Sequence, residues 1–517
     1  MTETLVEKVA LYAGSLAEIP AISDTFGNDL TYSELWAAAS GIAGKLQEIR
    51  ENIDFAFVMA NRGPLQAIAI LAARISGVPL AIIDIRQGSA RIASMLNQGN
   101  SIAGIVDKIG ENLLGKTDEL EGLSSVSGYL KVELDNFQSD WMIFPCATED
   151  SAGSDKAKCV PDRTALIIYT SGSTGNPKGV CIGESDLDER ARVEKDWFGI
   201  QAEDCVLGVL PINFDVGLTQ LLGTLFAGGH YVFSSSWFPA DILKQISLYR
   251  PCGLAMSPMI WKGLLKVHDT DQLWGQLNTL RYVTLSGGPL PLPDLLVINQ
   301  NLKNTVFVKT YGQTEMFRIA SCKVVNEADL ESVGGVYPGV EISITDDSGQ
   351  VLPSGREGNI QAQGLGRMLG YVGEVNKDIQ SPVVTGDVGY LDDSGRLVIS
   401  GRKSDMLKIL DQRVFPQDVA NTIKGVLNVS DVVVLVSDAS GSSDPVLSAV
   451  VEMDDPGLGD EQAAKGILRQ RLASHIVPRN IYFIEKLPET LSGKIDIPAV
   501  RDIVERIDRI KAEPVAD

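Results

Sequence analysis

The chain has 517 residues, of which 44% are hydrophobic and 22% charged, and its formal net charge is −22 at pH 7. This length exceeds what a single hydrophobic core serves, so two or more domains are expected, and the negative charge argues against nucleic-acid binding, which needs clustered Lys and Arg. No apolar run reaches the roughly 18 residues of a membrane span, and the six cysteines show no C-x-x-C spacing, so we expect a cytoplasmic protein with reduced thiols and no zinc site.

Short apolar runs alternate with helical stretches through the first 320 or so residues. Thr31 precedes a stretch with apolar residues at helical spacing up to Leu46, which predicts a capped helix. The predicted strands are residues 55–59, 81–85, 165–169, 206–210, 253–256 and 282–285. This alternation is typical of parallel strands covered by helices. The predicted fold class of this part is therefore α/β.

The pattern changes at about residue 335. Residues 340–344, 358–363, 389–391 and 396–400 read as strands joined by Gly-rich turns, which predicts a β-rich subdomain over about 335–404. Beyond residue 405, strands over 432–436 and 447–451 and a helix over 461–474 predict a small α+β domain.

Residues 169–179 read YTSGSTGNPKG and follow the apolar run 165–168. Hydroxyl side chains alternate with glycines, whose backbone N–H groups can turn towards an anion, and a lysine near the end adds positive charge. The predicted phosphate-binding residues are Thr170, Ser171, Gly172, Ser173, Thr174, Gly175 and Lys178. The segment is not the P-loop of NTPases, because G-x-x-x-x-G-K-[ST] cannot be aligned with it. A flexible linker is the alternative, but linkers do not follow a buried strand and end in Pro-Lys-Gly.

This loop resembles the phosphate loop of the ANL superfamily of AMP-forming adenylating enzymes, which includes acyl- and aryl-CoA ligases, peptide-synthetase adenylation domains and luciferases. Five further segments resemble its motifs in the same order: 286–290 (SGGPL), 310–315 (TYGQTE), 385–390 (TGDVGY), 401–405 (GRKSD) and 491–496 (LSGKID). The resemblance implies an enzyme that uses ATP and Mg²⁺ to activate a small carboxylic acid as an acyl adenylate. It also implies that residues 1–404 form an N-terminal adenylation domain, and that a small mobile domain, residues 405–517, closes on it about a hinge at Asp405.

The resemblance also implies roles for single residues. Lys494 bridges the substrate carboxylate and the ribose or phosphate oxygens, Glu315 helps to hold Mg²⁺, and Thr314 bonds the α-phosphate. Asp387 accepts hydrogen bonds from both ribose hydroxyls, and Arg402 supports the same region. The other implied ATP-binding residues are Gly287, Gly288, Pro289, Thr310, Tyr311, Gly312 and Gln313. A general base is not needed, because the acid is already ionised at neutral pH.

The acid-binding side is less specific. Phe214 and Asp215 occupy the place of a Phe-Asp pair whose aspartate binds the ammonium group of an amino acid in peptide-synthetase adenylation domains. Long-chain acyl-AMP ligases have a similar aspartate where no amine is implied, so both interpretations stay open. The candidate pocket residues are Phe214, Asp215, Gly217, Ser257, Met259, Gly287, Met316 and Phe317. Most are apolar, which favours a hydrophobic acid of modest size.

The acceptor loop departs from the pattern of relatives that form thioesters. These have a glycine about six residues after the hinge aspartate, and here Asp411 stands at that place, three residues after Lys408. A charged side chain there would obstruct a pantetheine arm and repel CoA phosphates or an acidic carrier protein. We therefore expect an amine, in particular that of an amino acid, to accept the acyl group and form an amide, as in coronafacate ligases. Transfer to the thiol of CoA or a carrier protein is the alternative, and an inactive adenylate-binding regulator is a third.

Overall fold

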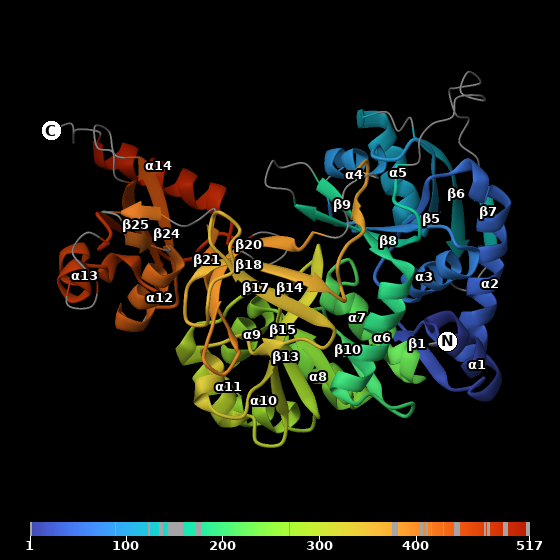
Figure 1. The fold of residues 1–517 in the computed structure, drawn as a ribbon, viewed down its shortest axis with the longest axis horizontal. Helices are drawn as coiled ribbons and strands as arrows, with labels where there is room; N and C mark the ends of the chain where they lie inside the picture. Colours follow the sequence, from blue (N-terminus) through green and yellow to red (C-terminus); the bar gives the residue numbers. More distant parts are fainter. Residues whose placement is uncertain are drawn as a thin grey trace.

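Figure 1 shows a large body and a smaller C-terminal part in the computed structural model of the chain. The structure describes residues 3–87, 89–121, 125–133, 138–142, 159–171, 177–267, 269–374, 381–403, 407–409, 412–414, 416–427, 429–438, 445–469, 472, 476–489 and 495–512. None of the helices in these ranges combines the length and the apolar character needed to cross a membrane.

One large sheet has eight strands in the order β19-β9-β8-β4-β3-β5-β6-β7. Its strands are β3 (Phe55–Met59), β4 (Leu80–Ile83), β5 (Ile102–Val106), β6 (Val126–Glu133), β7 (Gln138–Met142), β8 (Thr164–Ser171), β9 (Pro177–Gly183) and β19 (Gly370–Tyr371). The central strands β8, β4, β3, β5 and β6 are parallel, and the flanking strands β7, β9 and β19 are antiparallel. The β8–β9 hairpin therefore carries the two ends of the predicted phosphate loop.

The other large sheet has nine strands in the order β16-β15-β14-β13-β12-β10-β11-β1-β2. Its strands are β1 (Pro20–Asp24), β2 (Asp29–Thr31), β10 (Cys205–Gly208), β11 (His230–Phe233), β12 (Gly253–Met256), β13 (Tyr282–Leu285), β14 (Val306–Gln313), β15 (Met316–Lys323) and β16 (Gly335–Val336). The strands from β14 to β1 are parallel, whereas β15, β16 and β2 are antiparallel. The predicted α/β fold class is confirmed.

The two sheets share a core because alternate residues of each strand face opposite sides. In β3, Ala56 and Val58 belong to the shared core, whereas Phe57 packs on the outer side. The helices of the large body are α1 (Leu5–Ser15), α2 (Tyr32–Ile49), α3 (Pro64–Ser76), α4 (Ser89–Leu96), α5 (Lys108–Glu121), α6 (Glu184–Phe198), α7 (Asp215–Ala227), α8 (Pro239–Tyr249), α9 (Pro258–Leu265), α10 (Thr270–Leu277) and α11 (Leu292–Asn301), with 3₁₀ turns η1 (Arg50–Asn52) and η3 (Glu327–Leu330). Helices α3, α6 and α7 pack in the shared core, α4 and α5 pack on the outer face of the first sheet, and α8 to α11 cover that of the second.

Helix α2 shows how the sequence starts a helix at the predicted cap. The Thr31 side chain accepts a hydrogen bond from the Glu34 N–H at 3.2 Å, and the Glu34 carboxylate accepts one from the Thr31 N–H at 2.9 Å. This capping box satisfies N–H groups that have no partner inside the helix.

A separate antiparallel sheet follows, with strands β17 (Val340–Thr345), β18 (Gly358–Gly364), β20 (Val383–Leu391) and β21 (Leu397–Arg402). The β20–β21 hairpin places Asp387 opposite Arg402. This hairpin supplies one side of the site described below.

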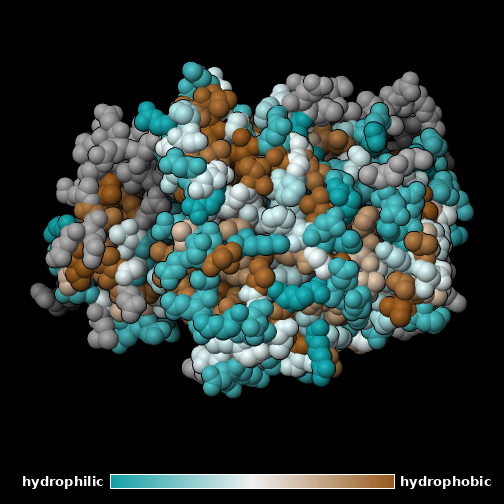
Figure 2. Space-filling model, turned by 60° about the horizontal axis from the view of Figure 1, so that its bottom comes forward, coloured by the Kyte–Doolittle hydropathy of each residue, from teal (hydrophilic) through white to brown (hydrophobic). Residues whose placement is uncertain are grey.

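The described residues of the C-terminal part form a two-stranded ribbon, a three-stranded sheet and three α-helices. Its elements are β22 (Leu407–Ile409), β23 (Gln412–Val414), α12 (Pro416–Leu427), β24 (Asp431–Asp438), β25 (Pro445–Glu452), η5 (Pro456–Leu458), α13 (Glu461–Leu468), β26 (Asn480–Ile484) and α14 (Ile497–Ala512). The helix predicted over 461–474 ends at Leu468, and residues 470, 471 and 473–475 lie outside the described part. On the face drawn in Figure 2, hydrophobic residues form several separate groups among hydrophilic ones.

Candidate active site

The predicted nucleotide and acid residues lie at the carboxyl ends of neighbouring parallel strands. Strands β10, β12, β13 and β14 are adjacent in the nine-stranded sheet. They lead into residues 209–217, Ser257, residues 286–290 and residues 310–315. In an open α/β sheet this edge is where ligands bind. The sheet therefore brings together segments that are far apart in the sequence.

Two glycines at this edge are required by the backbone. Gly287 has a φ of +86°, in the left-handed region that other residues rarely adopt. A Cβ at Gly312 would lie 2.4 Å from the backbone nitrogen of Arg318, because the chain turns back there from β14 into β15. A side chain at Gly287 would strain the backbone there, and one at Gly312 would displace the turn that carries Thr314 and Glu315.

Asp387 is the polar centre of the β-rich side of the site. Its Oδ2 accepts a hydrogen bond from the Tyr311 hydroxyl at 2.5 Å, and its Oδ1 lies 3.0 Å from Arg402 Nε. Burial and the neighbouring carboxylate raise the pKa of Tyr311, so its hydroxyl keeps the proton that it donates. The Asp387 residue is 7% exposed. A carboxylate has about four lone-pair positions, which suits the predicted contact of Asp387 with ribose hydroxyls.

Hydroxyl groups join the ends of β13 and β14 beside the predicted adenine segment. Ser286 Oγ lies 2.6 Å from Thr310 Oγ1 and 3.1 Å from Thr284 Oγ1. Ser286 and Thr284 are 1% and 2% exposed, and Thr310 is half-buried. Gly288, Pro289 and the predicted residue Gln313 lie at the same edge, the first two exposed and the last half-buried.

Tyr371 connects the phosphate side of the site with the predicted metal residue. Its hydroxyl donates to Glu315 Oε1 at 3.1 Å, and Lys178 Nζ lies 5.3 Å from the centroid of its ring. Strand β19, which carries Tyr371, pairs with β9, which carries Lys178. Thr170 lies opposite Lys178 in the β8–β9 pair. The sequence interpretation missed Tyr371, because its role depends on this strand pairing.

Part of the predicted phosphate loop lies outside the described residues, namely Gly172, Ser173, Thr174 and Gly175, and nothing is described for the side chain of Ser171.

Glu315 fits the predicted role in Mg²⁺ binding as a single carboxylate. Within the described ranges, no group of three or more His, Cys, Asp or Glu side chains could hold a metal ion. Mg²⁺ in ATP-using enzymes is usually bound through one or two carboxylates together with substrate phosphates. The half-buried Glu315, close to Lys178 through Tyr371, matches that donor set. A bound ion there would offset negative charge on the phosphate oxygens.

The predicted acid-pocket residues lie around the start of α7 and β15. Met316 is 0% exposed, whereas Phe214 is 44% exposed. Ser257 and Met259 are half-buried at the start of α9. A Cβ at Gly217 would lie 2.3 Å from the Pro211 carbonyl oxygen, so the glycine lets α7 pack closely on the preceding loop.

Asp215 is the first residue of α7, and its Oδ1 is buried without a hydrogen-bond partner among the described residues. Burial raises the pKa of its carboxyl to about 6, and the charge of Arg190 opposes this shift. The charge of Glu315 acts in the same direction as burial, and a hydrogen bond from the Thr314 side chain opposes it. Asp215 is therefore linked both to the predicted catalytic segment and to a buried cation.

Two buried arginines behind the acid pocket were not predicted. Arg190 of α6 is 3% exposed and lies 2.6 Å from Asp186. Arg318 of β15 is 2% exposed and lies 2.7 Å from Glu194. Both guanidinium groups lie over the Phe317 ring, at 4.7 and 5.3 Å. The acidic and basic residues of α6 follow the pattern of a solvent-exposed helix, so the sequence did not indicate that any of them is buried. The packing of the layers buries Arg190 and Glu194.

The hinge and acceptor residues are described only in part. Asp405, Asp411 and Lys494 lie outside the described residues. Lys408 belongs to β22 and pairs with Arg413 of β23, and its side chain is outside the described part.

The sequence matches the family of AMP-binding enzymes over residues 9–372, which is more than half of the chain. The chain therefore belongs to this family. It is an AMP-forming ligase that activates an acid with ATP.

Two relatives show the range of proteins to which the chain is similar. It is 25% identical over 538 residues to the D-alanine–D-alanyl carrier protein ligase of Listeria monocytogenes serotype 4a, and the match covers 98% of this chain and 100% of that protein. It is also 25% identical over 555 residues to the nonribosomal peptide synthetase vlms of Lecanicillium sp, covering 98% of this chain but 6% of that protein.

Among solved structures, the amide bond synthetase McbA from Marinactinospora thermotolerans has a similar fold. The two superpose with a TM-score of 0.79 at 21% sequence identity, covering 97% of this chain and 99% of McbA. At this identity the likeness concerns the fold.

Proposed function

We propose that the enzyme activates a hydrophobic carboxylic acid as an acyl adenylate and transfers the acyl group to the amine of a small molecule, in particular an amino acid, to form an amide. The observation that carries the choice of acceptor is Asp411, where thioester-forming relatives of the superfamily have glycine. Transfer to the thiol of CoA or a carrier protein is the second candidate. The full-length similarity to a carrier protein ligase favours that alternative.

In the proposed first step, a carboxylate oxygen of the acid bonds to the α-phosphorus of ATP and pyrophosphate leaves. Negative charge builds on the entering and leaving oxygens and is met by cations and N–H donors. Lys494 and Thr314 serve the α-phosphate and the acid, and residues 170–178 serve the β- and γ-phosphates. In the second step the amine nitrogen bonds to the acyl carbon, AMP leaves, and the amine loses a proton to water.

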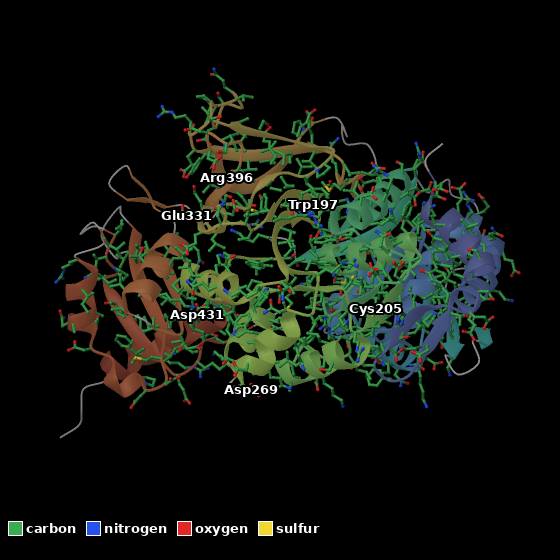
Figure 3. All side chains as sticks on the ribbon, turned by 90° about the horizontal axis from the view of Figure 1, so that it is seen from below. Trp197, Cys205, Asp269, Glu331, Arg396 and Asp431 are labelled. Carbon is green, nitrogen blue, oxygen red and sulfur yellow. The ribbon has the colours of Figure 1, made fainter. Side chains whose placement is uncertain are left out.

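The division into an adenylation domain of residues 1–404 and a lid of residues 405–517, hinged at Asp405, is part of the proposal. Support comes from the contact between the two parts, which is ionic where it is described. Lys262 of α9 pairs with Asp431 at the start of β24, and Asp431 is labelled in Figure 3. Lys424 of α12 lies 3.7 Å from Asp294 of α11. Such contacts can exchange with water more readily than an apolar interface.

Two features of the pocket support a hydrophobic acid without an amino group. Met316 and Phe317, two of the predicted pocket residues, are apolar and are 0% and 5% exposed. The charges of Arg190 and Arg318 both act on the Asp215 carboxyl. Because these two cations oppose the effect of burial on Asp215, the presence of this aspartate does not by itself require an ammonium group on the substrate.

The test is to incubate the enzyme with ATP, Mg²⁺ and a panel of aliphatic, aromatic and amino acids, and to offer hydroxylamine, CoA or amino acids in parallel. Pyrophosphate release identifies the acid, and product masses identify the acceptor. We expect hydroxamates from apolar acids, amides when amino acids are supplied, and little acyl-CoA.

A matched variant separates the two acceptor classes. Asp411→Gly should raise thioester formation and leave the rate of pyrophosphate release unchanged, because the first step does not use this loop. A wild type that forms acyl-CoA rapidly, and no amide with any common amino acid, would leave the thiol ligase as the correct assignment.

A further inference from the structure

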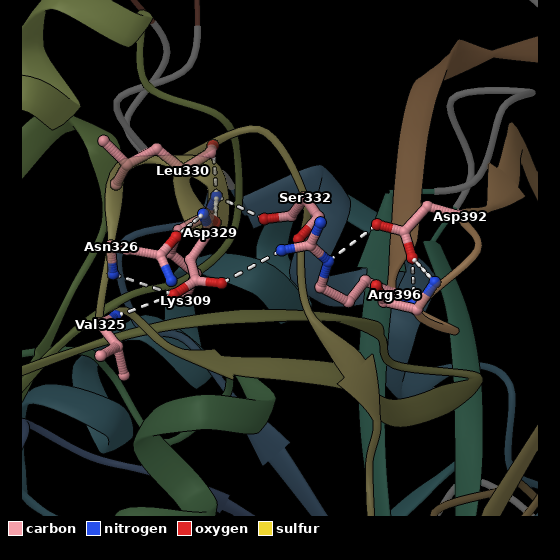
Figure 4. A network of polar contacts seen from close by, with 9 residues as sticks. Lys309, Val325, Asn326, Asp329, Leu330, Ser332, Asp392 and Arg396 are labelled. Atoms are coloured by element: carbon pink, nitrogen blue, oxygen red, sulfur yellow. Dashed lines mark hydrogen bonds and ion pairs between the residues drawn. The ribbon is translucent and has the colours of Figure 1, made fainter.

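Lys309 is a buried lysine in β14, two residues before Tyr311, and it is 7% exposed. Its Nζ donates to three backbone carbonyl oxygens, those of Asp329 at 3.1 Å, Leu330 at 2.6 Å and Ser332 at 2.5 Å. Figure 4 shows this network. An ammonium group has three N–H donors, so all three are used. The backbone of residues 329–332 therefore surrounds the positively charged ammonium group of Lys309.

Such a group is costly to bury. Burial lowers the pKa of Lys309 to about 8, which leaves the amine mostly protonated at neutral pH. A buried cation is weak evidence for stability, because an apolar side chain of similar size would avoid the desolvation cost. The position of Lys309 next to the nucleotide segment therefore points to a role other than stability alone.

The network continues from this loop to the β20–β21 hairpin. Asp329 Oδ1 lies 3.3 Å from Arg396 Nη1, and Arg396 Nε lies 2.8 Å from Asp392 Oδ2. The backbone adds two hydrogen bonds between the loop and β21, from the Val333 N–H to the Leu397 oxygen at 2.9 Å and from the Leu397 N–H to the Gly334 oxygen at 2.8 Å. The turn at one end of the hairpin is thus fixed to the loop that Lys309 holds.

The same hairpin carries Asp387 and Arg402, and β14 carries Tyr311. The Tyr311–Asp387 hydrogen bond joins β14 and β20 directly at the site. The Lys309 network joins the same two elements a second time, away from the site. Tyr311 also packs in one apolar cluster with Leu397 and Ile399 of the hairpin. Apolar packing is not directional, so the two polar attachments add a defined orientation to it.

We propose that Lys309 is a positioning residue for the nucleotide: through the carbonyl groups of residues 329–332 and the Asp329–Arg396 ion pair, it holds the β20–β21 hairpin against β14 so that Asp387 and Tyr311 meet the ribose of ATP in a fixed geometry. It does not touch a substrate. The inference rests on the proposed roles of Asp387 and Tyr311.

The test compares Arg396→Met, Asp329→Asn and the double variant with the wild type, because Arg396 is partly exposed, at 32%, and its loss leaves the core intact. We expect KM for ATP to rise about tenfold, within the range found for residues that orient a binding group from behind. The turnover number at saturating ATP and KM for the acid should stay near the wild-type values. Arg396→Lys should restore most of the affinity. Lys309→Met should show the same selective effect on ATP, and its combination with Arg396→Met should be less than additive.

The matched control is Arg281→Met, which removes another ion pair between distant segments, that with Asp204 at 2.6 Å, on the opposite edge of the sheet. It should shift the thermal midpoint without a change in KM for ATP. An unchanged KM for ATP in folded Arg396→Met and Lys309→Met, or an equal rise in KM for ATP and for the acid, would overturn the proposal. Asp387→Asn tests the proposed function separately. A normal KM for ATP in that variant would show that Asp387 does not bind the nucleotide.

Discussion

The nucleotide side of the site and the contact of the C-terminal part with the large body are built from different interactions. On the nucleotide side, Asp387, which is 7% exposed, accepts a hydrogen bond from the half-buried Tyr311 and also pairs with Arg402, whose side chain is 57% exposed. At the C-terminal contact, Lys262 and Asp431 form an ion pair whose side chains are 30% and 19% exposed. Buried hydrogen bonds resist salt, whereas partly exposed ion pairs are screened by it. We therefore expect the Tyr311–Asp387 hydrogen bond to persist in high salt and the Lys262–Asp431 contact to weaken.

The largest effect on rate is expected from Lys494. In the proposed mechanism this residue of the C-terminal part contacts the α-phosphate and the acid. Lys494→Ala should lower the rate of pyrophosphate release by about 10²–10³-fold, the effect of removing one preorganised donor. The exposed lysine Lys486 of the same part provides the control, since Lys486→Ala should leave the rate unchanged. Near-normal pyrophosphate release from Lys494→Ala would refute the assignment.

The largest effect on stability is expected from the buried ion pair between Arg318 and Glu194, which lies behind the predicted acid pocket. Arg318→Met leaves Glu194, which is 1% exposed, without its partner and should cost about 3 kcal/mol or more of unfolding free energy. Burial already raises the pKa of Glu194. Without the guanidinium the carboxyl takes up a proton more readily, so the destabilisation should be smaller at pH 5 than at pH 8. Denaturant titrations at both pH values measure this.

The matched control is Arg192→Met on the same helix, whose ion pair with Glu189 is 42% and 35% exposed. It should cost less than about 1 kcal/mol at either pH. Equal losses of unfolding free energy in Arg318→Met and Arg192→Met would show that burial does not determine how much each ion pair contributes to stability.

An intermediate effect is expected for ATP affinity. Asp387→Asn keeps the shape of the side chain but removes its charge, and it should raise KM for ATP by roughly 10- to 100-fold, the worth of charge-assisted hydrogen bonds. Isothermal titration with a non-hydrolysable ATP analogue should show a matching rise in the dissociation constant. Asp346→Asn, in the β17–β18 turn of the same sheet, should leave ATP affinity unchanged. An unaltered KM for ATP in Asp387→Asn would contradict the ribose assignment.

The smallest effect on stability is expected at the C-terminal contact. Lys262→Met or Asp431→Asn should change the unfolding free energy by less than about 1 kcal/mol. The distance between fluorescent labels on the two parts should nevertheless change in low salt and converge with the wild type in high salt. The charge exchange Lys262→Asp with Asp431→Lys should restore the wild-type distance. A wild-type distance that is the same at all salt concentrations and in all variants would show that these ions do not hold the C-terminal part.

Much of the fold could be predicted because it depends on local patterns. Continuous apolar runs of four to eight residues predicted the buried parallel strands, and Thr31 marked the start of α2. The end of α13 was predicted less well: the helix ends at Leu468, whereas the sequence predicted residue 474. The end of a helix depends on its tertiary contacts as well as on its periodicity.

By itself, the sequence determined the α/β class, the order of the motifs and the residue types expected to bind ATP. Each of these depends on patterns within short stretches of the chain. Tertiary structure alone decided that Tyr371 stands between Lys178 and Glu315, that Tyr311 reaches Asp387, and that Arg190 lies near Asp215. It also decided that a lysine in β14 is enclosed by the carbonyl groups of residues 329–332. The physical reason is that these contacts join strands and helices that are distant in the chain, and strand order and the packing of layers, not local periodicity, determine which of them become neighbours.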